Sequence, residues 1–210
     1  MFNKIKEIFL KNYKWLICFI CLFCFLLLTE DVFNKEIMQG DIIGYNFISN
    51  YLISDTFTPI MKVITFFGSA IWIIILTIIL FFILRNKKQN ILLGTNLVII
   101  TILNQALKFI LKRPRPTEFR IIDESGYSFP SGHSMISMAF YGYLIYLVYR
   151  NIKNKYLKWI LIIILSILII LIGISRIYLG VHYTSDVLGG FLLSVSYLVL
   201  FIHITNSIEK

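Results

Sequence analysis

Residues 156–174 read YLKWILIIILSILIILIGI, an apolar run with a single charge, Lys158, near its beginning. A helix of about 20 apolar residues crosses the ~30 Å hydrocarbon core of a bilayer. The 210-residue chain is 58% hydrophobic and 15% charged, against about 45–50% and about 25% in soluble domains. A soluble domain of this length cannot bury so large an apolar share. The composition also excludes disordered, collagen-like and disulfide-stapled secreted chains, and it predicts an integral membrane protein.

Six apolar runs are long enough, or nearly long enough, to span a bilayer. They are residues 13–29, 59–84, 89–107, 134–149, 156–174 and 187–204. A cleaved signal peptide is the competing interpretation of the first run, but no small-residue cleavage site follows Leu28, so we expect a retained helix. The prediction is an all-α fold: one domain over residues 1–210, with six transmembrane helices in a single bundle.

The links between these runs alternate in charge. Residues 4–14, 85–88 and 150–158 are basic, whereas the first link, residues 30–58, is acidic. Because basic residues collect in cytoplasmic loops, this pattern places both termini in the cytoplasm and the first, third and fifth links outside. The same rule accounts for most of the net charge of +9, so we expect a lipid bilayer as partner and no nucleic acid. Residues 30–58 are apolar enough to form a helix on the membrane surface, which the sequence alone leaves open.

The third link departs from this rule, because it is assigned to the outside and yet is basic. Its cations, one of them just before it, are Lys108, Lys112, Arg113, Arg115 and Arg120. Either the orientation is inverted or a span is miscounted, or these cations bind an anion. An inverted chain would put three other basic links outside, so we favour anion binding.

Three stretches concentrate the polar residues that orientation does not explain. They are residues 108–116, 127–134 and 175–186, all in or beside links assigned to the outer face. Lys108, Arg115 and Arg176 offer an ammonium and two planar guanidinium groups, which suit a phosphate. Ser131 and Gly132 stand at an expected helix start, where unpaired backbone N–H groups and the helix dipole favour an anion. The three stretches together predict a phosphate-binding site.

Two histidines in these stretches have different settings. His182 and Asp186 are four residues apart and so share one face of a helix. A carboxylate there can fix the imidazole tautomer, which suits His182 to act as a nucleophile and leaves His133 to act as a general acid. Taken alone, the His182–Asp186 pair could equally be a capping and packing pair. The catalytic interpretation depends on all three stretches occurring together.

No metal or other cofactor is expected. His133, His182 and Asp186 could be drawn together as metal ligands, but the surrounding cations would repel a divalent ion. His203 stands alone near the end of the last run and is interpreted as interfacial. The cysteines share one apolar run, where they predict small hydrophobic residues rather than a disulfide or metal site. They are Cys18, Cys21 and Cys24.

The spacing K-x6-R-P, then P-S-G-H, then S-R-x5-H-x3-D resembles that of the type 2 phosphatidic acid phosphatase family of integral-membrane lipid phosphatases. Here the motifs are Lys108–Pro116, Pro130–His133 and Ser175–Asp186, with no departure from the pattern. The resemblance covers about residues 90–200. Soluble vanadium haloperoxidases share the motifs, but the apolar runs argue against that alternative.

The resemblance implies a role for each residue. His182 would attack phosphorus and form a phosphohistidine while Asp186 orients it. His133 would protonate the leaving group and then activate the hydrolytic water, with no metal required. The phosphate oxygens would be held by Lys108, Arg115, Ser131, Gly132 and Arg176.

The predicted function is hydrolysis of a lipid phosphate or polyprenyl diphosphate at the outer face of a bacterial cytoplasmic membrane. Undecaprenyl diphosphate is the first choice of substrate, and phosphatidic acid or phosphatidylglycerophosphate is the alternative. A non-catalytic transporter or anion-binding protein belongs to a different class, and it is disfavoured because the chain shows no inverted repeat. The sequence does not fix the head group, the lipid chain length or the oligomeric state.

Overall fold

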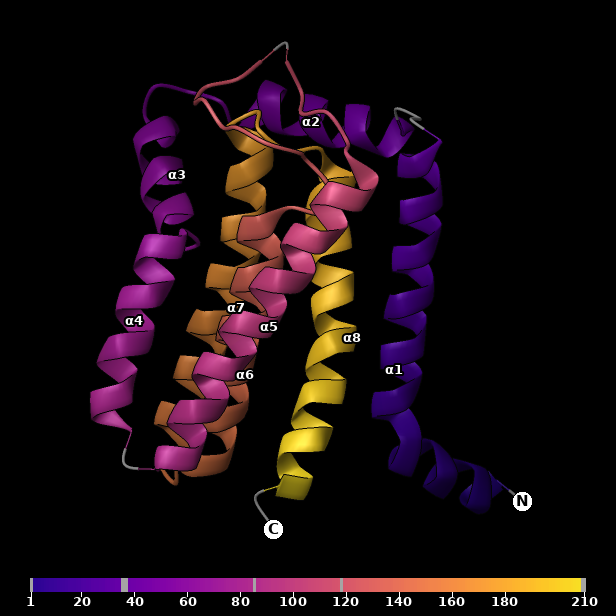
Figure 1. The fold of residues 1–210 in the computed structure, drawn as a ribbon, viewed down its shortest axis with the longest axis vertical. Helices are drawn as coiled ribbons and strands as arrows, with labels where there is room; N and C mark the ends of the chain where they lie inside the picture. The colour runs from indigo at the N-terminus through magenta and orange to yellow at the C-terminus, as the bar shows by residue number, and fades with distance from the viewer. Residues whose placement is uncertain (1, 35–37, 85, 118, 209–210) are drawn as a thin grey trace.

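The computed structural model describes residues 2–34, 38–84, 86–117 and 119–208, with side chains from residue 12 to residue 207 within these ranges. In this part of the chain all regular secondary structure is helical (Figure 1). The helices are α1 (Phe2–Phe33), α2 (Gln39–Tyr51), α3 (Phe57–Phe66), α4 (Ala70–Ile83), α5 (Lys87–Leu111), α6 (Gly132–Asn151), α7 (Lys155–Tyr178) and α8 (Thr184–Ile208). The all-α prediction is confirmed.

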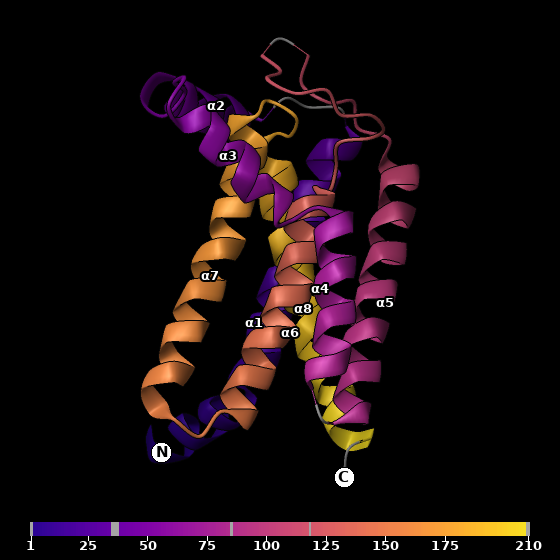
Figure 2. The same ribbon diagram turned by 90° about the vertical axis from the view of Figure 1, so that its left-hand side faces the viewer.

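Four helices are long and apolar enough to cross a membrane, and the bent pair α3–α4 counts as a fifth span if it is taken as one. The four are α1 from Asn12, α5, α7 and α8. Helix α6, expected as a span over residues 134–149, does not reach the same apolarity. It packs against α5, α7 and α8 inside the bundle (Figures 1 and 2), where it buries polar side chains such as Ser134 and Ser137. A multi-pass membrane protein is confirmed, and the count of six spans stays a prediction.

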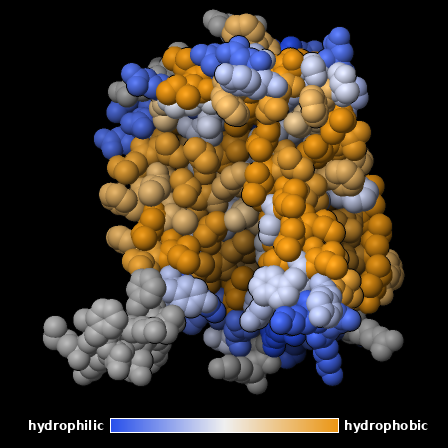
Figure 3. Space-filling view, turned by 180° about the vertical axis from the view of Figure 1, so that it is seen from behind, coloured by the Kyte–Doolittle hydropathy of each residue, from blue (hydrophilic) through white to orange (hydrophobic). Residues whose placement is uncertain are grey.

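The surface carries the matching pattern. Seen from behind, apolar residues form a broad belt around the middle of the bundle, between two hydrophilic ends (Figure 3). Large exposed side chains of α7 contribute to this surface, including Ile163, Ile167 and Ile170. Exposed apolar area of this extent marks an interaction surface, and a belt around a bundle of spanning helices fits lipid.

The second run, expected to be continuous over residues 59–84, is broken. Helices α3 and α4 meet at an angle of 51° across a short link. Within it Ser69 caps α4 by accepting a hydrogen bond from the Trp72 amide. At Gly68 a Cβ atom would lie 2.6 Å from Ile172 Cγ2 and 3.1 Å from His133 Cδ2. The glycine therefore lets the break approach α6 and α7 closely.

All three motif-bearing stretches lie at one end of the bundle. The start of α1, the end of α8 and the links α4–α5 and α6–α7 lie at the opposite end (Figures 1 and 2). Helix α2, within the acidic link, runs across the motif-bearing end (Figure 1). This arrangement agrees with the predicted alternation of links, although Arg85 and the side chains of residues 4–11 lie outside the description. The side of the membrane that each end faces stays a prediction.

Candidate active site

His182 lies in the turn between α7 and α8, and a glycine shapes that turn. Gly180 has a φ of +69°, and a Cβ atom there would lie 2.1 Å from the carbonyl oxygen of Phe119. Only glycine combines this left-handed conformation with so close an approach. The turn is tied to the α5–α6 loop by the Ile121 amide, which donates to the Leu179 carbonyl over 3.1 Å.

A buried carboxylate stands behind the His182 ring. Asp186 is completely buried, and its Oδ2 lies 3.3 Å from His182 Nδ1. It also accepts hydrogen bonds from the Tyr183 amide at 2.8 Å, from Arg113 Nη1 at 2.7 Å and from Ser128 Oγ. A carboxylate held by three donors is ionised and fixed in place. It is the natural acceptor for a proton on Nδ1.

The other ring nitrogen contacts a cation. Arg115 Nη1 lies 3.0 Å from His182 Nε2. A guanidinium can only donate hydrogen bonds, so Nε2 is the acceptor and carries a lone pair. The proton of the neutral ring is therefore assigned to Nδ1, facing Asp186.

Burial lowers the pKa of His182 to about 4, with Asp186 opposing the shift and the guanidinium groups of Arg176 and Arg115 adding to it. The imidazole is therefore neutral near pH 7. This is the protonation state in which a histidine is nucleophilic.

His182 opens onto a cavity of about 450 Å³, called the cationic cavity here. The charged and histidine residues of its lining are Lys108, Arg115, Glu124, His133 and His182, and Gly132 lies beside them. Backbone carbonyls hold both cations: those of Tyr127 and Ser128 accept from Lys108, and those of Ser125, Gly126 and Val181 accept from Arg115. These carbonyls are neutral, so the two cations face only the single carboxylate of Glu124, and the cavity favours an anion.

Of the remaining residues expected to bind phosphate, Gly132 lines this cavity, whereas Ser131 and Arg176 do not. Gly132 approaches α5 so closely that a Cβ atom would lie 3.1 Å from Asn104 Oδ1. Ser131 caps α6 by accepting from the Ser134 amide at 3.4 Å, and its own amide donates to the Asp186 carbonyl at 3.0 Å. Among the described residues, Ser131, Arg176 and Asp186 stand behind the lining rather than in it.

Arg176 already has an anionic partner. Its Nη2 forms an ion pair with Glu124, and its Nη1 donates to Thr65 Oγ1 over 2.8 Å. Burial opposes ionisation of Glu124, but the Arg176 and Arg115 guanidinium groups outweigh it and lower the pKa of this carboxyl. Glu124 is therefore an anion that lines the cationic cavity.

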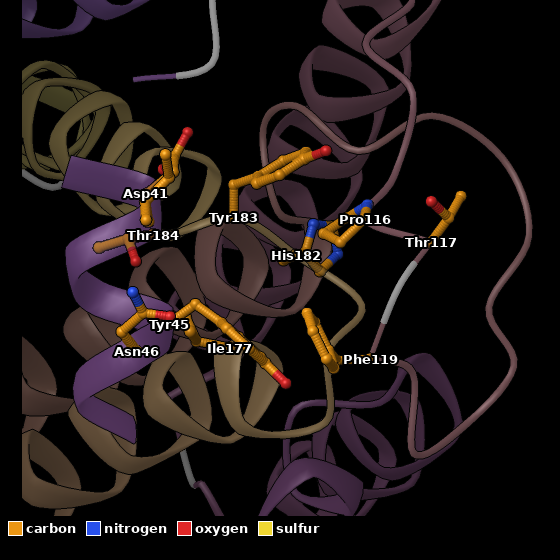
Figure 4. Close-up of a pocket in the computed structure, with 12 residues that line it drawn as sticks. Asp41, Tyr45, Asn46, Pro116, Thr117, Phe119, Ile177, His182, Tyr183 and Thr184 are labelled. Atoms are coloured by element: carbon orange, nitrogen blue, oxygen red, sulfur yellow. The ribbon is translucent and has the colours of Figure 1, made fainter. Parts of the chain in front are cut away.

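A second cavity, also about 450 Å³, lies between α2, the α5–α6 loop and the α7–α8 turn (Figure 4). Tyr45 and Asn46 of α2 line one side of it, and Pro116 and Phe119 of the α5–α6 loop line the other. His182 borders both cavities.

Sequence reasoning missed four residues of this site: Asp41, Arg113, Glu124 and Ser128. Arg113 was grouped with the link cations expected to bind an anion, but it pairs with the carboxylates of Asp41 and Asp186 instead. Ser128 lies inside a stretch that the sequence singled out. Asp41 and Glu124 gave no local signal, because their partners are distant along the chain.

The residues set aside as non-functional lie apart from the site. His203 makes an edge contact with Trp15, at 5.0 Å between ring centroids. The cysteines are unpaired in α1, and Cys18 packs against Ser196 of α8. Across the described ranges, no group of three or more His, Cys, Asp or Glu side chains could hold a metal.

A neutral histidine backed by a carboxylate and facing a cationic cavity, at one end of a membrane bundle, defines the class: a membrane phosphatase. Residues 89–210 match the PAP2 superfamily, and the chain belongs to this family. The family resemblance drawn from the three motifs is confirmed, and the chain is an enzyme rather than a transporter.

Characterised relatives carry two different names. A phosphatidylglycerophosphatase B of Bacillus subtilis (strain 168) is 31% identical over 159 residues, 72% of this chain and 75% of that protein. An undecaprenyl-diphosphatase of Sulfolobus acidocaldarius is 30% identical over 213 residues, 95% of this chain and 96% of that protein. A crystal structure of a transmembrane PAP2-type phosphatidylglycerolphosphate phosphatase from Bacillus subtilis superposes with a TM-score of 0.80. It is 27% identical, and the match covers 92% of this chain and 98% of that one.

Proposed function

We propose that this phosphatase cleaves its substrate in two steps through a phosphohistidine on His182. In the first step Nε2 forms a bond to phosphorus as the bond to the leaving oxygen breaks, and His133, which must enter this step as the imidazolium, gives that oxygen a proton. In the second step His133 takes a proton from water, whose oxygen attacks phosphorus and breaks the N–P bond. Inorganic phosphate leaves and both histidines return to their starting states.

The observation that carries this proposal is the pair of contacts on the His182 ring. Nδ1 faces Asp186 at 3.3 Å, and Nε2 accepts from Arg115 at 3.0 Å at the border of the cationic cavity. The Nε2 lone pair is held by Arg115 at the edge of the cavity, and a phosphate that draws this guanidinium to its own oxygens would free the lone pair for attack. Lys108, Arg115 and the start of α6 at Gly132 would stabilise the charge that builds on the phosphate oxygens.

Arg176 joins this set by exchange of partners. Its guanidinium pairs with Glu124, and an incoming phosphate would take the place of the carboxylate. Ser131 contributes by holding the first turn of α6, so that its amides can point toward the phosphate. In this proposal no metal takes part, because the cavity already holds the positive charges that a metal would supply.

We further propose that the substrate is undecaprenyl diphosphate. The relative of that name aligns with nearly the whole of this chain, including α2. The second candidate is phosphatidylglycerophosphate, favoured by the similarity to the Bacillus subtilis enzyme and its structure. In both substrates the lipid tails would stay in the bilayer while the phosphate enters the cavity, beside Phe109 and Ile136.

We place the enzyme in a bacterial cytoplasmic membrane with this cavity facing outward, as the positive-inside rule predicts. A cysteine at exposed Asp123, in a variant that lacks the three native cysteines, tests this orientation. The variant should react with an impermeant thiol reagent added to intact cells. Labelling only after lysis would invert the topology.

The test of function is phosphate release by the purified protein in detergent with a chelator present. Undecaprenyl diphosphate, phosphatidylglycerophosphate and phosphatidic acid are compared by kcat/KM. His182→Ala is the inactive control, and His203→Ala is the matched substitution of a histidine outside the site. A preference for the diphosphate supports the first candidate, and a preference for a glycerolipid supports the second. Release from none of the three would contradict both.

A further inference from the structure

Helix α2 carries a buried carboxylate that points into the catalytic end of the bundle. Asp41 is only 3% exposed, although it lies in an acidic link. Its Oδ2 pairs with Arg113 Nη2 at 2.7 Å and accepts from Ser185 Oγ at 2.9 Å. Its Oδ1 accepts from the Ser185 amide at 2.7 Å. A charge so deeply buried would be strongly destabilising without these partners.

Arg113 joins Asp41 to the carboxylate behind His182. The same guanidinium that pairs with Asp41 through Nη2 pairs with Asp186 Oδ1 through Nη1, also at 2.7 Å. The guanidinium of Arg113 also stacks on the Tyr183 ring, whose centroid lies 4.2 Å from Arg113 Cζ. One arginine is thus shared between two buried carboxylates, and only one of them touches His182.

The charges in this cluster suit the phosphoenzyme better than the free enzyme. Asp41 and Asp186 carry one negative charge each and Arg113 one positive charge, so the cluster has a net charge of about −1. When Nε2 of His182 binds phosphorus and Nδ1 keeps its proton, the imidazole ring becomes cationic. The net negative cluster behind Nδ1 would then be balanced.

We propose that Asp41 is a positioning residue for the reaction: by sharing Arg113, it keeps the negative charge of Asp186 available to His182. Without Asp41, the full positive charge of Arg113 would bear on Asp186 and weaken its hold on the Nδ1 proton. Asp41 itself lies outside the lining of the cationic cavity described here, so it acts through Arg113 and Asp186. The inference rests on the proposed role of His182.

The packing of α2 supports this role, because it fixes the position of Asp41 relative to the first residues of α8. A Cβ atom at Gly44 would lie 2.2 Å from Thr184 Oγ1, so α2 contacts α8 as closely as glycine allows. Asp41 is one turn before Gly44 and reaches Ser185, the residue after Thr184. Helix α2 therefore completes the site as well as covering it.

The test compares Asp41→Asn and Asp41→Glu with the wild type, all as the full-length protein in detergent. Asp41→Asn keeps the size and removes the charge, and it should lower kcat by about 10- to 100-fold, the scale found for residues that orient the ligands of a metal. KM should change less than about threefold, because the phosphate donors are untouched. Asp41→Glu keeps the charge and should retain at least about ten times the kcat of Asp41→Asn. Asp55→Asn, the same change at an exposed aspartate near the end of α2, is the matched control and should behave as the wild type.

A second readout separates positioning from mere stability. The rate of the first turnover, followed by the burst of lipid product, should fall together with kcat in Asp41→Asn. Thermal unfolding of each variant reports whether the fold is intact. A normal kcat and burst in folded Asp41→Asn would overturn the inference, even if its melting temperature falls. Equal losses in the Asn and Glu variants would also overturn it, because the charge would then not matter.

His182→Ala, measured in the same series, distinguishes failure of the inference from failure of the proposed function. If His182→Ala keeps its activity, the nucleophile is wrong and the proposed function fails. If His182→Ala is inactive while Asp41→Asn is normal, only the inference about Asp41 fails.

Discussion

Glu124 is the one anion among the polar residues that line the described cationic cavity, and its removal should change how tightly the site binds phosphate. The carboxylate pairs with Arg176. A phosphate that contacts Arg176 must first displace it. Glu124→Gln keeps the size of the side chain and removes the charge, so the competition for Arg176 should weaken.

The size of the effect follows from the burial of the pair. A hydrogen bond to a charged group contributes about 1.5–3 kcal/mol. Glu124 is 31% exposed while Arg176 is buried, so solvent screening places the cost of breaking the pair near the lower end of this range. Since about 1.4 kcal/mol corresponds to a factor of ten in affinity, the inhibition constant for phosphate should fall about tenfold in Glu124→Gln.

The assay is competitive inhibition of lipid hydrolysis by inorganic phosphate, repeated with orthovanadate. Asp123→Asn is the matched control, since it removes a neighbouring carboxylate that is exposed. An inhibition constant that stays the same or rises in Glu124→Gln would refute the exchange of partners at Arg176. An equal fall in Asp123→Asn would also refute it, because the effect would then be a general change of charge.

Four other perturbations have defined outcomes. His182→Ala should lose about 10³-fold or more of kcat while folding normally, and retention of a tenth of wild-type turnover would end its role as nucleophile. In labelled-histidine NMR, with the three histidines assigned by single substitutions, His182 should become half protonated near pH 4. Since protonation removes the Nε2 lone pair, activity should be lost as the pH falls through that value, and half protonation near pH 6.5 would contradict the burial argument. Activity should survive excess chelator, whereas a loss reversed only by a divalent cation would require a metal. Gly180→Ala should lower stability by more than the ~1–2 kcal/mol of a left-handed alanine, because its Cβ atom would also meet the Phe119 carbonyl. An unchanged thermal unfolding curve would argue against this.

The sequence predicted the parts of the fold that depend on composition and local spacing. Apolar runs require helices in a membrane, so the helical class followed directly from stretches such as residues 156–174. The break between α3 and α4 was missed because Gly68 and Ser69 are too few to interrupt the hydropathy of the run. Such a Gly–Ser pair inside a helix is a known place for a kink and could have been used as a signal.

Helix α6 shows a second limit. The span predicted over residues 134–149 stays a prediction, and hydropathy alone did not reveal that this helix lies in the middle of the bundle. Ser134 and Ser137 are tolerated there because neighbouring helices, rather than lipid, surround them.

The site divides in the same way. His182 and Asp186 were paired from their spacing of four residues, and the structure brings Nδ1 and the carboxylate within 3.3 Å. Local spacing could not predict the Asp41–Arg113 pair, because 72 residues separate the partners. In the sequence, a buried aspartate in an acidic link cannot be distinguished from a solvent-exposed one, because only the fold shows its contacts.

The most direct test of the central claim is to locate the phosphate during turnover. Undecaprenyl diphosphate labelled with ³²P at its terminal phosphate is mixed with the enzyme and quenched within milliseconds in alkali, which preserves phosphohistidine. His133→Gln is included, because it should slow hydrolysis of the intermediate. We predict label on His182, identified in the digested protein by mass spectrometry. Label on any other residue would contradict the mechanism. So would unlabelled protein while the wild type and His133→Gln both release phosphate.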